Sequence, residues 1–206
     1  MGYTRRLLWF TRQLHSDFLL MNLHTFFELF AGTRAWSRGM ELFSFAGVSA
    51  DRIYEDFAAN VINCDFLTPM GFLQVVAGVM RLHRGGILLA AIPCNSWVFL
   101  SRWTTGRGLD ILGNTGNAFV ASQNALVARM VYILILCIKR GVFWMIEQPW
   151  SSIVFEHPRW QYLERRFGHL LHYVECDMGV YTLDLVKKSV LVGTAPYLPN
   201  LGKVLT

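Results

Sequence analysis

An almost continuous run of apolar residues, GILLAAIPC at 86–94, is the feature that most limits how this chain can fold. A run of strand length without polar alternation is typical of a strand whose sheet is covered on both faces. Stretches of helical length lie on either side of it, MGFLQVVAGVMRLH at 70–83 and AFVASQNALVARMVYILILCIKR at 118–140. A strand between two helices predicts a parallel sheet with helical crossovers.

The same alternation of short apolar runs and helical stretches continues along the chain. We expect strands within 24–32, 48–56, 61–69 and 142–149, helices within 33–47 and 159–168, and two strands around a turn within 171–194. This order predicts an α/β domain over residues 24–206, with a doubly wound, Rossmann-like, mostly parallel sheet and a closing antiparallel hairpin. Residues 1–23 are rich in arginine and predict an amphipathic helical extension, with an organelle transit peptide as the alternative.

The chain is apolar enough to raise the question of a membrane span, since 53% of its 206 residues are hydrophobic. The longest apolar run, MVYILILCI at 130–138, lies between Arg129 and Lys139. Nine residues are about half of the ~20 that a bilayer-crossing helix needs. We therefore expect a buried helix there and no integral membrane segment.

The four cysteines stand at least 30 residues apart, so no pair has the spacing of metal ligands. We expect no metal site and no disulfide framework, and hence an intracellular protein. The net charge of +5 is compatible with an anionic partner such as DNA or RNA, although most basic residues serve only solubility.

Ligands of open α/β sheets bind outside the carboxyl ends of the strands, so the residues that follow each strand are the candidates for a site. Gly32 ends the first strand, where it either lets a ligand approach the following helix or simply makes a tight turn. Glu55 lies 23 residues later, near the usual spacing of an acid on ribose, although Asp56 or a solvated carboxylate fits equally well. Asp65 follows the third strand, where it accepts from an exocyclic amine or caps the turn.

Cys94 and Glu147 follow two further strands. A lone cysteine is most often a core residue, but Pro93 before it and polar residues after it place this thiol at the exit of a strand. Glu147 stands between WMI and QPW, where desolvating a carboxylate is costly unless it titrates or binds a partner. A thiol and a carboxyl on neighbouring strand ends would supply a nucleophile and a proton donor for an electron-poor ring.

Three stretches, in this order and at these separations, resemble motifs I, IV and VI of the cytosine-5 DNA methyltransferases. They are ELFAG at 28–32, IPCNS at 92–96 and EQP at 147–149, where the family usually has an acid before LFAG, then PPCQ and ENV. The resemblance covers about residues 24–195 and is closest to short methyltransferase-like proteins with PCSS and EQPxSS. It implies a methyltransferase fold that belongs to the S-adenosylmethionine-dependent superfamily.

The resemblance implies S-adenosylmethionine as the cofactor, with Glu55 on the ribose and Asp65 facing the adenine amine. The other residues implied to contact the cofactor are Phe30, Ala31, Gly32 and Pro93.

In the same resemblance Cys94 would attack carbon 6 of a cytosine in nucleic acid while Glu147 engages ring nitrogen 3, which makes carbon 5 nucleophilic. The base would leave the stack to reach such a pocket. The stretch SRWTTGRG would close on the nucleic acid with Arg102 and Arg107 on phosphates, the alternative being a merely solvated loop.

This sequence departs from the family pattern in several places. Thr33 and Arg34 replace the usual glycine pair, and Lys187 and Lys188 are the only counterparts of an arginine-rich motif near the closing hairpin. We expect no target-recognition segment after that hairpin. The alternative function is therefore a catalytically degenerate fold that binds nucleic acid or a protein without turnover. A third hypothesis, Cys94 as an acyl nucleophile, lacks a histidine partner near the other strand ends.

Overall fold

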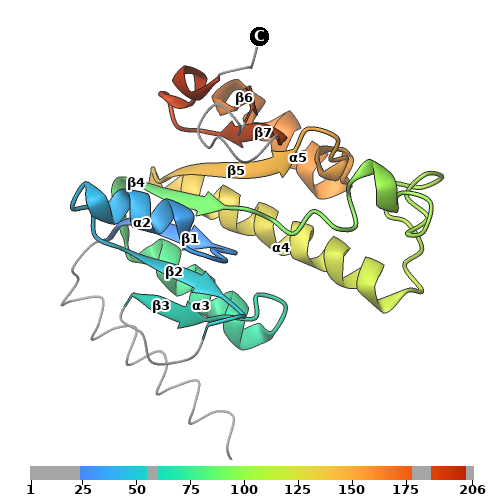
Figure 1. The fold of residues 1–206 in the computed structure, drawn as a ribbon, viewed down its shortest axis with the longest axis horizontal. Helices are drawn as coiled ribbons and strands as arrows, with labels where there is room; N and C mark the ends of the chain where they lie inside the picture. Colours follow the sequence, from blue (N-terminus) through green and yellow to red (C-terminus); the bar gives the residue numbers. More distant parts are fainter. Residues whose placement is uncertain (1–23, 55–59, 178–186, 203–206) are drawn as a thin grey trace, which may run out of the picture.

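The structure is a computed structural model that describes residues 24–54, 60–177 and 187–202. The predicted extension at 1–23 and Glu55 therefore lie outside the described residues. The described chain forms an α/β fold in which helices pack on a central seven-stranded sheet (Figure 1). The strands are β1 (His24–Leu29), β2 (Gly47–Asp51), β3 (Val61–Asn63), β4 (Leu82–Ala90), β5 (Phe143–Pro149), β6 (His172–Asp177) and β7 (Lys188–Gly193).

The strands lie in the order β3-β2-β1-β4-β5-β7-β6. β1 to β5 pair in parallel, whereas β7 runs antiparallel to both β5 and β6. The predicted mostly parallel sheet with a closing antiparallel hairpin is thus confirmed, and the arrangement is compatible with a Rossmann-like fold. From β1 the chain proceeds outward to β2 and β3 and then returns to place β4 on the other side of β1.

Within the described residues, four α-helices lie where the sequence predicted them: α2 (Ala35–Leu42), α3 (Pro69–Met80), α4 (Ala118–Arg140) and α5 (Pro158–Phe167). Local capping explains their ends. Asn117 accepts hydrogen bonds from the first amides of α4, and Gly141 ends that helix in the left-handed conformation. Thr68 caps α3 by accepting from the amide of Gly71 at 2.9 Å.

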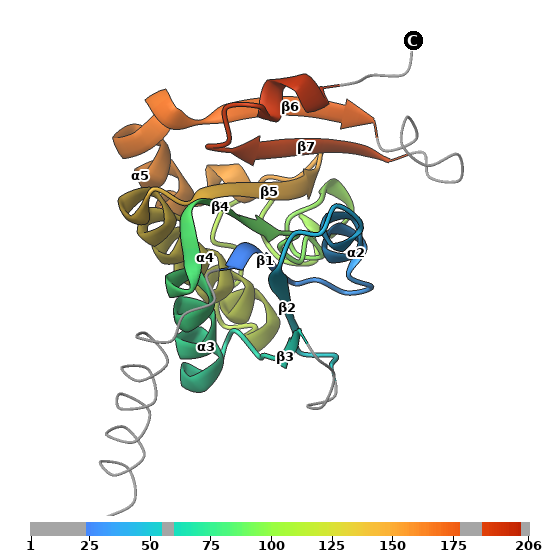
Figure 2. The ribbon, with the colours of Figure 1, turned by 90° about the vertical axis from the view of Figure 1, so that its left-hand side faces the viewer.

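Helices cover the sheet unequally (Figure 2). α3, α4 and α5 pack on one face in the main core, where Leu88 and Trp144 are fully buried. The other face carries a smaller core that includes Phe26 and contacts Met40 of α2. By length and composition α4 is the one helix among the described residues that could cross a membrane, but its residues Met130 and Leu134 are fully buried in the main core.

Two strands, β2 and β4, differ from the prediction at their boundaries. β2 ends at Asp51, well before residue 56, because its partner β3 is only three residues long and pairs with Ser49–Asp51. β4 begins at Leu82, before the glycines expected to separate helix from strand. It passes through them with a register shift against β1, and Gly85 takes a φ of +84°. β4 also ends at Ala90, so Cys94 lies four residues beyond the sheet.

Gly71 is required by close packing between α3 and the turn after β3. A Cβ at this position would overlap the main-chain carbonyl oxygen of Asp65. We predict that Gly71→Ala lowers the free energy of unfolding by about 3 kcal/mol, measured by urea denaturation. Gly39→Ala in α2 is the matched control, since nothing lies within 4 Å of its Cβ, and it should stabilise by about 0.5–1 kcal/mol. Equal effects of the two variants would contradict this account.

Candidate functional site

A cavity of about 420 Å³ opens at the carboxyl ends of β1 to β4. This is the place where the chain leaves β1 and β4 toward different neighbours, which is where ligands bind in open α/β sheets. Its volume is in the range of small-molecule sites. The lining comes from Phe30 after β1, residues 51–53 at the end of β2, residues 64–67 after β3, Pro93 after β4 and the first half of α4.

The cavity brings together three of the six residues implied by the family resemblance to bind the cofactor. Phe30, Asp65 and Pro93 line it. Ala31 and Gly32 lie in the adjoining turn between β1 and α2 but are not part of the lining. The ribose role expected of Glu55 cannot be placed, because that residue lies outside the described residues.

The turn after β1 is held in a left-handed conformation at alternate residues: φ is 59° at Phe30, 49° at Gly32 and 62° at Arg34. Gly32 has open space around its Cβ position, so glycine is needed there for its backbone conformation alone. A bulky residue such as Phe30 rarely adopts this conformation, and strained residues concentrate at functional sites. The strained Phe30 lines the cavity.

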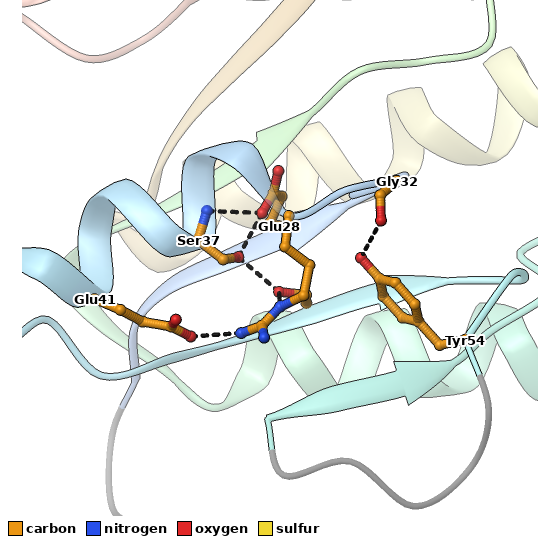
Figure 3. Close-up of polar contacts among 7 residues, drawn as sticks. Glu28, Gly32, Ser37, Glu41 and Tyr54 are labelled. Atoms are coloured by element: carbon orange, nitrogen blue, oxygen red, sulfur yellow. Dashed lines mark hydrogen bonds and ion pairs between the residues drawn. The ribbon is translucent and has the colours of Figure 1, made fainter.

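A buried polar network fixes the same turn against the sheet (Figure 3). The carboxylate of Glu28, which is 4% exposed, accepts from the amide and the hydroxyl of Ser37 in the first turn of α2. Arg34 donates to Ser49 at 2.9 Å and pairs with Glu41. The acid of ELFAG therefore caps α2, which satisfies a helix amide that would otherwise lack a partner.

Asp51 is a site residue that the sequence analysis missed. It ends β2, lines the cavity and accepts from the amide of Gly32 at 2.9 Å through Oδ2. Its other oxygen accepts from the amide of Ile53 at 3.2 Å. Asp51 lies 19 residues after Gly32, close to the spacing at which an acid contacts ribose. Its spacing from Gly32 could have identified Asp51 from the sequence, but the predicted strand extended beyond this residue.

Asp65 caps the turn after β3 and also lines the cavity. Its Oδ1 accepts from the amide of Leu67 at 3.0 Å, and its carbonyl accepts from Thr68, so turn capping is confirmed. The same residue lines the cavity. Acceptance from an exocyclic amine stays a prediction.

The segment that carries Cys94 is bonded to the end of β5. The fully buried side chain of Gln148 donates to the carbonyl of Ile92 at 2.6 Å and accepts from Ser152 at 2.9 Å. The carbonyl of Trp97 accepts from the amide of Ile153 at 2.9 Å. Cys94 is half-buried and does not line the cavity. The glutamine of EQP is thus a positioning residue for the cysteine loop.

Glu147 lies on β5 next to Gln148 and projects from the opposite face of that strand. Its Oε1 accepts from Ser189 of β7 at 2.6 Å and lies 3.1 Å from the Nζ of Lys187. Lys187 is one of the two counterparts of the family's arginine-rich motif, and the structure places it beside the expected catalytic acid. Glu147, like Cys94, is not part of the cavity lining.

The two arginines expected on phosphates are both engaged inside the protein. Arg107 is 4% exposed; it donates to Ser96 at 2.9 Å and stacks 3.5 Å over the ring of Trp97. Burial lowers its pKa to about 10. Arg102 is half-buried and donates to the carbonyl of Ser151 at 3.3 Å. In this conformation Arg107 is therefore an internal residue of the loop and is not placed to contact a phosphate from solvent.

The loop after Cys94 instead presents apolar side chains to solvent. The exposed fraction is 88% for Leu100, 73% for Trp103 and 90% for Leu109. Phe99 and Trp150 are exposed as well. Exposed apolar groups of this kind are typical of surfaces that bind another molecule.

Cysteine and metal chemistry give no further candidate site in the part of the chain that the structure describes. Cys64 lines the cavity, donates to the carbonyl of Gly71 at 3.3 Å, and has its pKa raised to about 11 by burial. Burial also raises the pKa of Cys137 to about 12. Within 24–54, 60–177 and 187–202, no group of three or more potential ligands could hold a metal ion.

No protein-family model matches this chain, and no curated protein matches it either. A function therefore has to be argued from the geometry of the cavity and from the resemblance of its three motifs.

His157 caps α5 as a neutral imidazole, since its Nδ1 accepts from the amide of Arg159 at 3.1 Å. Burial, with Arg107 and Arg159 nearby, lowers its pKa to about 4. The unfolded chain then binds more protons between pH 6.5 and 4. The stabilisation from this group is complete above pH 6.5 and falls as the pH falls through that window.

We predict that wild-type protein loses about 2 kcal/mol of unfolding free energy between pH 7 and pH 5 through His157. His157→Asn keeps a capping oxygen but does not titrate, so urea denaturation should show a correspondingly weaker pH dependence. The exposed His169→Asn controls for the loss of an imidazole. An unchanged pH dependence in His157→Asn would refute the assignment.

Proposed function

We propose that this protein is a methyltransferase-fold protein that binds S-adenosylmethionine at the carboxyl ends of β1 to β4. The observation that carries the proposal is the cavity there, which has the carboxylates of Asp51 and Asp65 in its wall. The order β3-β2-β1-β4-β5-β7-β6 with antiparallel β7 supports a doubly wound, Rossmann-like methyltransferase fold. The resemblance of ELFAG, IPCNS and EQP to the cytosine-5 methyltransferase motifs supports the same assignment.

The residues of the cavity fit the parts of this cofactor. Asp51 is suited to accept from ribose hydroxyls, and Asp65 from the adenine amine. Phe30 and Phe66 meet edge to face at 5.8 Å and provide an aromatic wall for the adenosine. When bound, S-adenosylmethionine supplies an electrophilic methyl group.

For catalysis we infer that the Cys94 thiolate forms a bond to carbon 6 of a cytosine while Glu147, as the carboxylic acid, donates its proton to ring nitrogen 3. Carbon 5 then becomes the nucleophile that takes the methyl group. Loss of the carbon 5 proton to solvent restores the ring double bond and expels Cys94 as a thiolate, and the proton on nitrogen 3 returns to Glu147. Among the described residues both partners of Glu147 use Oε1, which leaves Oε2 for the ring nitrogen. Gln148 holds the cysteine loop against β5 for this step.

Nucleic acid is the substrate class that the surface beside Cys94 supports. Phe99 and Trp103 expose aromatic rings, and bases stack on such rings without regard to sequence. A second function has its own support, because Leu100 and Leu109 are the most exposed of these side chains and suit a protein partner. In that case the chain is a catalytically degenerate methyltransferase fold that acts as a binding module.

We predict saturable binding of S-adenosylmethionine in isothermal titration calorimetry. Asp51→Asn should weaken it about ten- to a hundredfold, since a hydrogen bond to a charged group contributes about 1.5–3 kcal/mol. Asp110→Asn is the matched control, because Asp110 also accepts from the amide two residues later but lies outside the cavity. No saturable binding at millimolar cofactor would refute the proposed function.

For catalysis we predict that Cys94→Ala abolishes transfer of a radiolabelled methyl group to cytosine in DNA or RNA, with cofactor affinity nearly unchanged. Glu147→Gln should slow transfer at least a hundredfold through the loss of acid catalysis. Loss of cofactor binding in Cys94→Ala would instead identify a structural cysteine. Cofactor or nucleic-acid binding without any transfer by wild-type protein would favour the binding module, and affinity for nucleic acid should then fall with salt.

A further inference from the structure

Gln123, a residue of the cavity wall, has a buried acceptor without a partner. Gln123 lies in the first half of α4, lines the cavity and is 8% exposed. Its Oε1 is buried and accepts no hydrogen bond. Three other polar side chains of the wall are paired within the protein: Asp51 and Asp65 each accept from a main-chain amide, and Ser122 donates to the carbonyl of Phe119 at 2.8 Å.

An acceptor buried without a partner costs a protein stability, and folded proteins contain few of them. Apolar side chains occupy most of the buried face of α4, where Val120, Val127 and Met130 are fully buried. Leucine or methionine would continue that face at residue 123 without any cost of desolvation. A glutamine with its oxygen unpaired at the wall of a cavity is therefore explained by a donor that arrives with the ligand.

The position of Gln123 indicates which part of a ligand it meets. Arg129, about two turns further along α4, donates to the carbonyls of Phe66 and Thr68 at 2.7 and 3.0 Å. These bonds hold the first half of α4 against the turn after β3, the turn that contains Asp65. Leu126, between Gln123 and Arg129, packs in the same core cluster as Phe66. Gln123 and Asp65 therefore belong to the end of the cavity between α4 and the turn after β3.

We propose that Gln123 selects the purine base of the cofactor by accepting a hydrogen bond from the exocyclic amine of adenine. This inference rests on the proposed function. The amine carries two hydrogens, one on the side of ring nitrogen 1 and one on the side of ring nitrogen 7. Two acceptors at one end of the cavity, Asp65 and Gln123, can each take one of them. A glutamine amide can also donate to ring nitrogen 7, as it does when glutamine recognises adenine in DNA.

The test compares adenosine with purine riboside, which lacks only the exocyclic amine, in calorimetric titrations of the full chain. Wild-type protein should bind adenosine more tightly. Gln123→Met, which keeps the length of the side chain, should reduce the ratio of the two affinities roughly five- to tenfold by weakening adenosine alone. Gln123→Leu is the second variant. Ser122→Ala, a neighbour in the wall whose hydroxyl is already paired, should leave the ratio unchanged.

Thermal unfolding of the ligand-free variants gives an independent measurement. Replacing an unpaired buried amide by an apolar side chain should raise the melting temperature of Gln123→Met, whereas a structural amide would lower it. An unchanged affinity ratio in both Gln123 variants, or an equal loss of both ligands, would overturn the assignment to the amine. If wild-type protein binds neither these nucleosides nor S-adenosylmethionine, the proposed function itself fails. If binding persists with an unchanged ratio, only the role of Gln123 fails.

Discussion

The parallel pairing of β1 with β4 at the centre of the sheet determines where every candidate residue lies. Leu29 stands opposite Ala90, so the two strands end at the same level. From that level the chain turns into α2 on one side and toward α4 on the other, because β2 and β5 lie on opposite sides of this central pair. Two connections that diverge cannot close the space between them, and the cavity opens there. Its position is thus a consequence of strand order before any side chain is considered.

Hydrogen bonds between neighbouring strand ends give this edge of the sheet a fixed shape. Gln148 joins the end of β5 to the chain that leaves β4, and the bond between Gly32 and Asp51 joins the ends of β1 and β2. A residue beyond the end of a strand is no longer held by main-chain hydrogen bonds to a neighbouring strand. The side-chain hydrogen bonds named here hold it instead. Glu28 does the same for α2 through Ser37. Glu28 and Gln148 thus fix the position of the segments that surround the cavity.

Prediction from the sequence succeeded where an element depends on residues close to it in the chain, and failed where it depends on distant residues. α4 was predicted to the residue because its cap at Asn117, its apolar periodicity and Gly141 are all local. The predicted end of β2 was wrong. A strand ends where its partner ends, and β3, the partner of β2, is only three residues long. Because the predicted strand ran on to residue 56, the sequence indicated Glu55 as the acid at its end and passed over Asp51. Arg107 shows the same limit, because a basic residue in a polar loop looks alike in sequence whether it faces solvent or stacks on Trp97.

The two carboxylates of the cavity wall are paired with the main chain, whereas the buried oxygen of Gln123 is not. Asp51 and Asp65 each have an oxygen bonded to the main chain, which fixes their carboxylates before any ligand enters. Gln123 has no such bond at Oε1. A protein selected for stability alone would have replaced it, since an apolar side chain fits the rest of that helix face. Local rules of packing are most often broken at functional sites, so the unpaired glutamine supports a ligand in this cavity independently of the motifs that first suggested one.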